Sequence, residues 1–175
     1  MAHVRITWSG SGEVRESKTE FEIRPITDRA FLDELLRLRW SGGALMLRGK
    51  LVHPKDVEAL AAYHDGRLAG VATWRLEGPV IYLATLNNIT EQRGVGVALL
   101  DAMMKLGREK GSALLRVIVT NDNLNALGFY QRRGFRIVAV HPGAIDTIRT
   151  LLPNIPTMGA NRIPMRDEIE LEIDL

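Results

Sequence analysis

Cysteine is absent from the 175-residue sequence. This absence excludes disulfide bonds, thiolate metal sites and a cysteine nucleophile, and it agrees with a reducing compartment. Long apolar runs are missing too, because no segment approaches the ~20 apolar residues of a membrane-spanning helix. The N-terminal segment also lacks the apolar core of a signal peptide. From these absences we expect a cytoplasmic protein with no membrane partner.

An excess of charge of one sign is also missing. The chain has 23 basic and 21 acidic residues, which leaves a formal net charge of +2, and the two signs are interleaved along the sequence. Nucleic-acid-binding proteins cluster their basic residues on one face, so we expect no nucleic-acid partner. Histidine and acidic residues do not occur at a metal-ligand spacing such as H-E-x-x-H, so we expect no bound metal.

What the sequence does contain is typical of one globular domain with a sizeable core. Hydrophobic residues make up 46% and charged residues 25% of the chain. Residues 1–20 are mostly polar and rich in turn-forming residues, and we interpret them as a mobile lead-in. Residues 21–175 are expected to form the single domain.

The spacing of apolar residues predicts the order of helices and strands. Alternation predicts strands over residues 21–26, 68–76, 80–86, 114–119, 135–140 and 168–175. Helical spacing predicts helices over residues 28–40, 54–63, 97–110, 121–133 and 143–152. This order predicts a mixed α/β fold (an α+β mixed sheet), in which a central sheet is flanked by helices.

Residues 41–52 and the end of the chain have patterns of their own. Residues 41–52 contain glycine and are expected to form a loop. The last residues, "EIELEIDL", alternate acidic and aliphatic side chains, which predicts an antiparallel or edge strand with one face in water. Such a strand would be able to pair across a homodimer.

A glycine-spaced loop, "EQRGVGVALL" at residues 91–100, runs directly into a helical pattern. Loops of this shape often hold phosphate. A P-loop is excluded because no Gly-Lys-Ser/Thr follows, and a dinucleotide fingerprint is excluded because Leu99 occupies the third glycine position. Two interpretations remain open: an ordinary strand-to-helix turn, or an anion site at the start of the helix.

The anion site has a physical basis. No side chain is placed to cap the helix, so the amides of residues 94–99 are expected to be free, and the positive end of the helix dipole favours an anion there. Gly94 and Gly96 allow close approach, Ala98 avoids a clash, and Arg93 adds a charged contact. Such a loop suits a pyrophosphate held mainly by the backbone.

A second motif, "NDNLNALGFYQRRGF", follows at residues 121–135. The two motifs, with the predicted strand between them, resemble the signature of the GNAT family of N-acetyltransferases. That signature is Q/R-x-x-G-x-G/A at a helix start and then N-x-x-A-x-x-x-Y-x-x-x-G-F. The matching residues are Arg93, Gly96, Ala98, Asn123, Ala126, Tyr130, Gly134 and Phe135.

The resemblance implies a GNAT-like domain with a splayed pair of parallel strands, here the strand ending near Asn87 and the strand over residues 114–119. It implies acetyl-CoA as co-substrate, bound in the wedge between these strands. It also implies that the pantetheine arm pairs with the first strand and that the pyrophosphate lies on the glycine loop. The cofactor-binding residues implied in this way are Leu86, Asn87, Asn88, Arg93, Gly94, Val95, Gly96, Val97, Ala98, Asn123 and Tyr130.

Tyr130 is the predicted catalytic residue. By family resemblance it assists departure of the CoA thiolate, either by giving up its proton or by hydrogen bonding. A phenol is protonated at neutral pH, since its ordinary pKa is ~10. The alternative is an aromatic side chain that only packs with Phe129 and Phe135. Asn123 has two possible roles as well, contact with the cofactor arm or capping of its helix.

The general base remains open in the sequence. Many family members carry a glutamate on the strand before the glycine loop, but residues 80–90 contain no acid. Either a water chain serves, or the base comes from elsewhere, with His141 and Asp146 as candidates.

The resulting functional prediction is acetyl transfer from acetyl-CoA to a primary amine of a small molecule or peptide, by direct attack in a ternary complex. The alternative is a non-catalytic module that binds or senses acyl-CoA. Acceptor specificity is expected from residues 28–64 and 141–166, with Trp40 and Met46 as candidate pocket residues.

Overall fold

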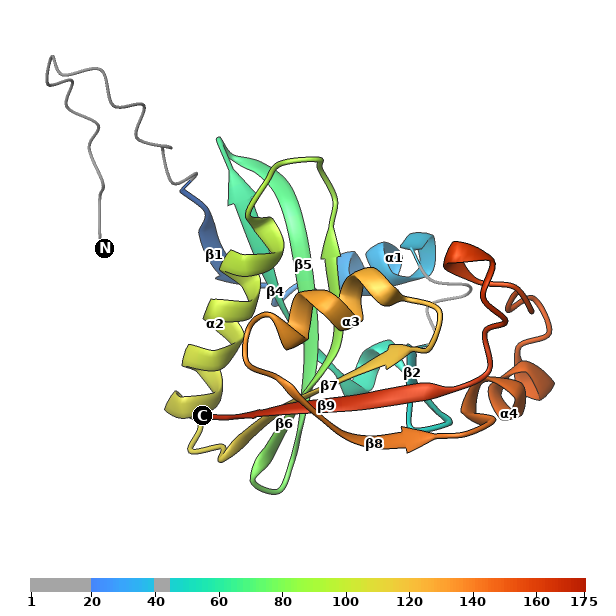
Figure 1. The fold of residues 1–175 in the computed structure, drawn as a ribbon. Helices are drawn as coiled ribbons and strands as arrows, with labels where there is room; N and C mark the ends of the chain where they lie inside the picture. Colours follow the sequence, from blue (N-terminus) through green and yellow to red (C-terminus); the bar gives the residue numbers. More distant parts are fainter. Residues whose placement is uncertain (1–19, 40–44) are drawn as a thin grey trace, which may run out of the picture.

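A seven-stranded mixed sheet forms the centre of the protein in this computed structural model, which describes residues 20–39 and 45–175 (Figure 1). The strand order is β1-β4-β5-β6-β7-β9-β8, and every neighbouring pair is antiparallel except β6 and β7. In sheet order the strands are β1 Glu22–Pro25, β4 Glu58–His64, β5 Arg67–Glu77, β6 Val80–Asn88, β7 Leu114–Thr120, β9 Glu168–Asp174 and β8 Arg136–His141.

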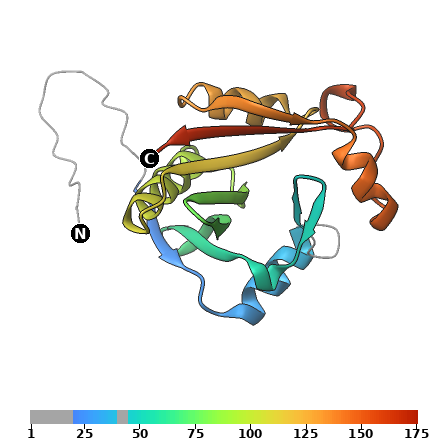
Figure 2. The same ribbon diagram turned by 90° about the horizontal axis from the view of Figure 1, so that it is seen from below.

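Helices cover both faces of this sheet (Figure 2). The remaining elements are α1 Arg29–Arg39, α2 Val95–Glu109, α3 Leu124–Gln131, α4 Ala144–Leu151, the hairpin strands β2 Leu45–Leu47 and β3 Lys50–Val52, and the short 3-10 turns Pro54–Asp56 and Ala160–Arg162. Along β6, Ile81 and Leu83 belong to the core cluster under α2 and α3. Tyr82 points to the opposite face and belongs to the cluster under α1 and the hairpin. The central strands are therefore buried on both sides, which explains their nearly continuous apolar sequence.

The predicted fold class is confirmed. The sheet is mixed, helices flank it, and β6 and β7 are its one parallel pair in the described part of the chain. The strand over residues 80–86 continues to Asn88. The predicted lead-in lies outside the described residues except for Glu20, as does Trp40. No helix among the described residues is long and apolar enough to cross a membrane.

The helix predicted over residues 54–63 is wrong. Pro54–Asp56 forms a single 3-10 turn, and Glu58–His64 is strand β4. The alanines of "EALAAYH" favour a helix locally, but β4 pairs with β1 on one side and β5 on the other. Small side chains let helix α2 pack closely against this strand, with Ala62 fully buried in the cluster below it. Tertiary pairing has overridden the local propensity.

The loop predicted over residues 41–52 is also wrong in part. Within its described residues, β2 and β3 form an antiparallel hairpin. Arg48 and Gly49 are its two turn residues, with φ values of 54° and 66°. Positive φ at both positions is the requirement of the tight turn that best matches strand twist. The turn places Arg48 over the ring of Tyr82 on β6 and the amide of Gly49 beside Glu168 on β9.

The last strand is antiparallel, as predicted, but it is not an edge, and of its four acids only Asp174 faces water. Strand β9 lies between β7 and β8, so both its edges are occupied and it cannot pair across a dimer. Glu168, Glu170 and Glu172 are 1%, 3% and 6% exposed. The alternation of acidic and aliphatic residues predicted a strand correctly. The buried glutamates of this strand contact other charged side chains instead of water.

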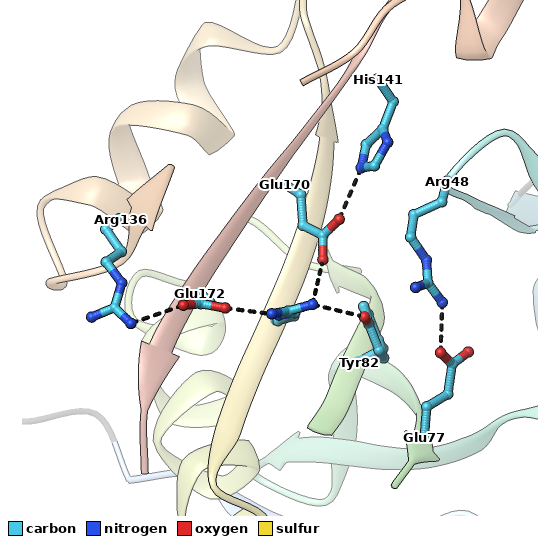
Figure 3. Close-up of polar contacts among 8 residues, drawn as sticks. Arg48, Glu77, Tyr82, Arg136, His141, Glu170 and Glu172 are labelled. Atoms are coloured by element: carbon cyan, nitrogen blue, oxygen red, sulfur yellow. Dashed lines mark hydrogen bonds and ion pairs between the residues drawn. The ribbon is translucent and has the colours of Figure 1, made fainter. Parts of the chain in front are cut away.

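Those side chains form an ion-pair network across the sheet (Figure 3). Arg116 on β7 donates to Glu172 at 2.8 Å and to Glu170 at 3.1 Å. Glu172 also accepts from Arg136 at 2.8 Å, and Glu170 lies 2.8 Å from the Nε2 atom of His141. Burial alone would raise the pKa of Glu172, but the hydrogen bonds from Arg136 and Arg116 outweigh it and hold that pKa below its usual range.

We expect Glu172→Gln to lower the free energy of unfolding by about 1–3 kcal/mol at neutral pH, because charge-assisted hydrogen bonds are lost. Since the pKa of Glu172 is lowered in the folded state, its contribution is present above the unfolded value and is lost as pH falls through the folded one. The difference between the two proteins should therefore shrink in acid. Urea denaturation at several pH values measures it.

Glu22→Gln is the control, because its pair with Arg24 is exposed and should be worth nothing measurable. An equal loss for both variants, or a Glu172→Gln loss that grows in acid, would contradict the role given to the network.

Candidate active site

Strands β6 and β7 run together and then part. Their pairing begins at Val80 and Leu114 and ends at Leu83 and Val117. Beyond that point β6 stays paired with β5 as far as Asn88, and β7 stays paired with β9 as far as Thr120. Each strand thus keeps its outer partner while the two inner edges separate. A splayed parallel pair was predicted, and the structure contains it.

A β-bulge marks the point of separation. On β6, Leu83 pairs with Trp74 and Thr85 pairs with Thr73, so Ala84 is an extra residue opposite β5. A bulge bends its strand and increases the local twist. The hydroxyl groups of Thr73 and Thr85 lie 2.8 Å apart and fix the register just beyond it. The bulge therefore turns the end of β6 away from β7.

A cavity of about 210 Å³ lies where the strands part. Its walls come from the separated ends of β6 and β7, from α3, and from one residue each of the hairpin and β9. The lining residues are Met46, Leu83, Ala84, Thr85, Leu86, Ile118, Val119, Thr120, Asn123, Ala126, Tyr130 and Glu168. Of the predicted site residues, Leu86, Asn123 and Tyr130 are brought together here, and Met46 is a pocket residue as expected.

Tyr130 packs in the core and also borders the cavity, and its catalytic role stays a prediction. Its ring packs against Phe129 and Phe135, with centroid distances of 5.1 and 5.3 Å, and it is 6% exposed. It also lines the cavity. Burial raises the pKa of its hydroxyl well above the ordinary value. The phenol is therefore held in its protonated form, as a hydrogen-bond donor at the cavity wall.

Asn123 is the cap of α3. Its Oδ1 atom accepts a hydrogen bond from the amide of Ala126 at 3.0 Å. Because Asn123 also lines the cavity, the start of α3 is fixed beside it. The capping role is shown by this hydrogen bond, and contact with a cofactor arm stays a prediction.

The glycine loop begins α2 without a side-chain cap. Gly94 is the N-cap residue, with φ of 92°, a conformation that favours glycine. Arg93 and Gly94 are exposed, so the start of the helix is accessible. One part of the prediction is wrong: the amide of Ala98 donates to the carbonyl of Gly94 at 2.9 Å and is not free. The available donors are those of the first turn, up to Val97.

Close packing fixes this helix start on the sheet. A Cβ atom at Gly70 on β5 would lie 2.3 Å from Cγ1 of Val95 and 2.8 Å from the carbonyl oxygen of Asn87. At Gly96 a Cβ would meet Asn88 and Phe129 at ordinary distances of 3.5 and 3.7 Å. The end of β6, the start of α2 and the helix carrying Tyr130 therefore meet around this loop.

Neither predicted base lies in the cavity wall. His141 is bound to Glu170, and Asp146 is an exposed residue of α4 paired with Arg149. The acid in the wall is Glu168, the first residue of β9, which the sequence analysis missed. In the sequence it is one of several alternating acids, and only the position of β9 between β7 and β8 distinguishes it.

The hairpin turn holds Glu168. The amide of Gly49 donates to its Oε2 atom at 2.7 Å. Burial raises the pKa of this carboxyl group, although the amides of Gly49 and Arg48 and the nearby His141 oppose the change. Within the described residues no Arg or Lys lies within ion-pair distance of Glu168, unlike Glu170 and Glu172.

The long segment before β9 is held by hydrogen bonds. The Asn121 side chain donates to the carbonyl of Pro164 and accepts from the amides of Arg166 and Asp167. The buried Asp122 accepts from the amide of Ala160 at 2.7 Å. None of residues 141–166 lines the cavity, but the segment delivers Glu168 to it. A role of this segment in acceptor specificity stays a prediction.

A sheet whose parallel strands part over a cavity, beside an uncapped helix start, is the arrangement expected of an acyl-CoA-dependent acyltransferase. The model of the acetyltransferase (GNAT) family matches residues 18–135. The chain belongs to this family, a class of acetyl-CoA-dependent N-acetyltransferases, and it is an enzyme of that class. Within the described residues, no group of three histidine or acidic side chains is placed to hold a metal ion.

The chain is also similar to a relative in sequence and to solved structures in fold. The uncharacterized protein YxbD of Bacillus subtilis is 36% identical over 137 residues, which cover 78% of this chain and 86% of that protein. An IAA acetyltransferase from Bacillus cereus has a similar fold, with a TM-score of 0.71, 20% identity, and coverage of 89% of this chain and all of that one. A GNAT acetyltransferase from Elizabethkingia anophelis with acetyl-CoA bound has a TM-score of 0.67, 19% identity, and coverage of 90% and 100%.

We expect Gly70→Ala to lower the free energy of unfolding by about 1–3 kcal/mol, because the new methyl group overlaps Val95 and the backbone of Asn87. The double variant Gly70→Ala/Val95→Ala should be less destabilised than the sum of the single variants, since shortening Val95 removes the closest overlap. Urea denaturation of the four proteins measures this coupling. Strict additivity would show that Gly70 does not set the position of α2.

Proposed function

We propose that the enzyme transfers the acetyl group of acetyl-CoA directly to a primary amine while both substrates are bound. The observation that carries this proposal is the cavity between the parted strands, which Tyr130 lines from one side and the free edge of β6 lines from the other. A cavity with an aromatic hydroxyl donor and an unpaired strand edge fits a thioester and its leaving sulfur.

The pantetheine arm is proposed to lie along the inner edge of β6. The backbone groups of residues 84–88 on this edge are no longer paired with β7, and an extended amide-containing arm is able to add to them like a further strand. In this arrangement Leu86, Asn87 and Asn88 hold the arm and direct the thioester into the cavity. Asn123 borders the same space from the start of α3.

The pyrophosphate is proposed to bind at the start of α2. Amides from Gly94 to Val97 point along the helix axis, where the helix dipole adds partial positive charge. Arg93 is exposed next to them and supplies a full charge. Ala98 contributes its small side chain rather than its amide, since that amide is already bonded within the helix.

The amine attacks the thioester carbonyl, and the tetrahedral intermediate collapses with breakage of the carbon–sulfur bond. Tyr130 is proposed to donate its hydroxyl hydrogen bond to the leaving sulfur. An ordinary thiol has a pKa of ~8.5, so full transfer from a buried phenol is uphill, and hydrogen bonding to the thiolate is the larger part of its role.

A non-catalytic acyl-CoA sensor was the alternative suggested by the acid-free strand before the glycine loop. Glu168 lines the cavity, so an acid is present although it comes from another strand. The lack of an acid on β6 is therefore no longer a reason to prefer a sensor over an enzyme.

We expect CoA to raise the melting temperature of the protein, because ligand that binds only the folded state stabilises it by about 2.7 kcal/mol at 100 times its Kd. Gly96→Asp should abolish this increase. The position has room for a Cβ, and an acid in the first turn suits the helix, but its charge repels pyrophosphate. Differential scanning fluorimetry with CoA measures the shift.

Gly66→Asp is the charge control, because it introduces the same charge in an open turn between β4 and β5 and should keep the CoA response. Its φ of 74° strains a side chain, so each variant's increase is measured from its own melting temperature without CoA. Loss of the response in both variants, or in neither, would contradict the pyrophosphate site.

We expect Tyr130→Phe to lower the turnover number by about 100-fold while CoA binding is retained, because the hydroxyl donor is lost but the packed ring remains. Steady-state release of CoA thiol with butylamine as acceptor measures turnover, and calorimetry measures CoA affinity. Tyr63 lies on β4 and does not line the cavity, so the control variant Tyr63→Phe should behave as wild type. Wild-type turnover in Tyr130→Phe would reduce this residue to a packing role.

A further inference from the structure

Glu168 is a buried carboxyl group with no role in the binding of acetyl-CoA or in the departure of the CoA sulfur. It is 1% exposed, it lines the cavity that holds Tyr130, and it is the one carboxylate among the described lining residues. The neighbouring acids of β9 bind arginine in the network of Figure 3. Burying a carboxylate without a cation is costly, so its position needs a reason.

We propose that Glu168 is the general base of this enzyme and that its carboxylate receives the acceptor as an ammonium ion. This inference rests on the proposed acetyl transfer. The ammonium group of a primary amine supplies the cation that the protein itself does not place beside Glu168. The substrate class that follows is a primary alkylamine that is protonated in solution, with an ammonium group able to enter a cavity of about 210 Å³.

The chemistry requires such a base. An alkylammonium group with a pKa like that of lysine, ~10.4, must lose a proton before its nitrogen can attack. Glu168 takes this first proton and passes it to solvent. The nitrogen then bonds to the thioester carbon, the carbon–sulfur bond breaks, and a second proton from the nitrogen ends on the CoA sulfur, to which the Tyr130 hydroxyl donates a hydrogen bond. The products are the acetamide, CoA thiol and one released proton.

The surroundings of Glu168 suit a carboxylate that must gain and lose a proton. Gly49 of the hairpin turn occupies Oε2 and orients the group, which leaves acceptor sites on the carboxylate for an ammonium ion. His141 of β8 pairs in register with Glu168, Glu170 follows on β9, and Tyr130 faces the same cavity from α3. Burial raises the pKa of Glu168 above its ordinary value, which makes its carboxylate a stronger base.

Glu168→Gln separates catalysis from structure. Glutamine can still accept the Gly49 hydrogen bond through its side-chain oxygen, but it cannot take up a proton. We expect acetyl transfer to butylamine to fall by about 100-fold or more at pH 7, with CoA affinity unchanged. The deficit should shrink as pH rises toward the pKa of the amine, because solution then supplies neutral amine.

A second acceptor sharpens the test. The fluorine atoms of trifluoroethylamine withdraw electrons, so its amino group is largely neutral at neutral pH. The deficit of Glu168→Gln should therefore be several-fold smaller with trifluoroethylamine than with butylamine at the same pH. A residue that only shapes the cavity would reduce both rates alike.

Glu170→Gln is the matched control. It removes a buried carboxylate from the same face of the same strand, two positions away, but outside the cavity wall. We expect a lower melting temperature, because contacts with Arg116 and His141 are weakened, and near-wild-type turnover of butylamine at pH 7. The pH profile should shift slightly toward lower pH, because the charge of Glu170 is a minor cause of the raised pKa of Glu168.

The inference is overturned if Glu168→Gln keeps butylamine turnover within about 3-fold of wild type with a parallel pH profile. If wild-type protein binds CoA but acetylates neither amine, the proposed function fails instead. The base is then judged by a carbon-13 NMR titration of the Glu168 carboxyl group, assigned by its absence from Glu168→Gln. A pKa above the ordinary ~4.3 supports the inference, and a pKa at or below it overturns it.

Discussion

The hydrogen bonds between β6 and β7 end at Leu83 and Val117, and everything proposed for this enzyme depends on that ending. Both strands keep their outer partners, so the separation costs only the bonds of the inner edges, which become available to a ligand. The bulge at Ala84 fixes where it begins. The cavity, the Tyr130 hydroxyl and the uncapped start of α2 all lie around this opening.

Strand β9 shows how one sequence pattern can carry two kinds of carboxylate. Glu172 lies between two guanidinium groups that lower its pKa, and it contributes stability at neutral pH. Glu168 is more deeply buried but has only backbone donors and a nearby histidine, and its pKa is raised. An ionised Glu168 therefore works against the fold near neutrality. Sites that sacrifice stability in this way are typical of functional residues.

The sequence predicted the parts of the fold that local patterns determine. The helices that begin at the two motifs, α2 and α3, and the parallel pair β6–β7 lie where the apolar spacing and the family resemblance predicted them. The errors at β4 and β9 share one cause, since each strand is defined by partners distant in the chain. Alanines suggested a helix where two strands enclose β4, and alternating acids suggested a solvent-facing edge where β8 and the arginines cover β9. Glu168 was missed for the same reason, because it reaches the cavity only through this pairing.

The most direct test of the central claim is a crystal structure of the enzyme with CoA bound. We predict that the pantetheine arm lies along the inner edge of β6 at residues 84–88, that the pyrophosphate contacts the amides of residues 94–97, and that the sulfur ends beside Tyr130 in the cavity that also contains Glu168. A CoA molecule bound elsewhere, or one whose sulfur lies outside the space between β6 and β7, would contradict the account.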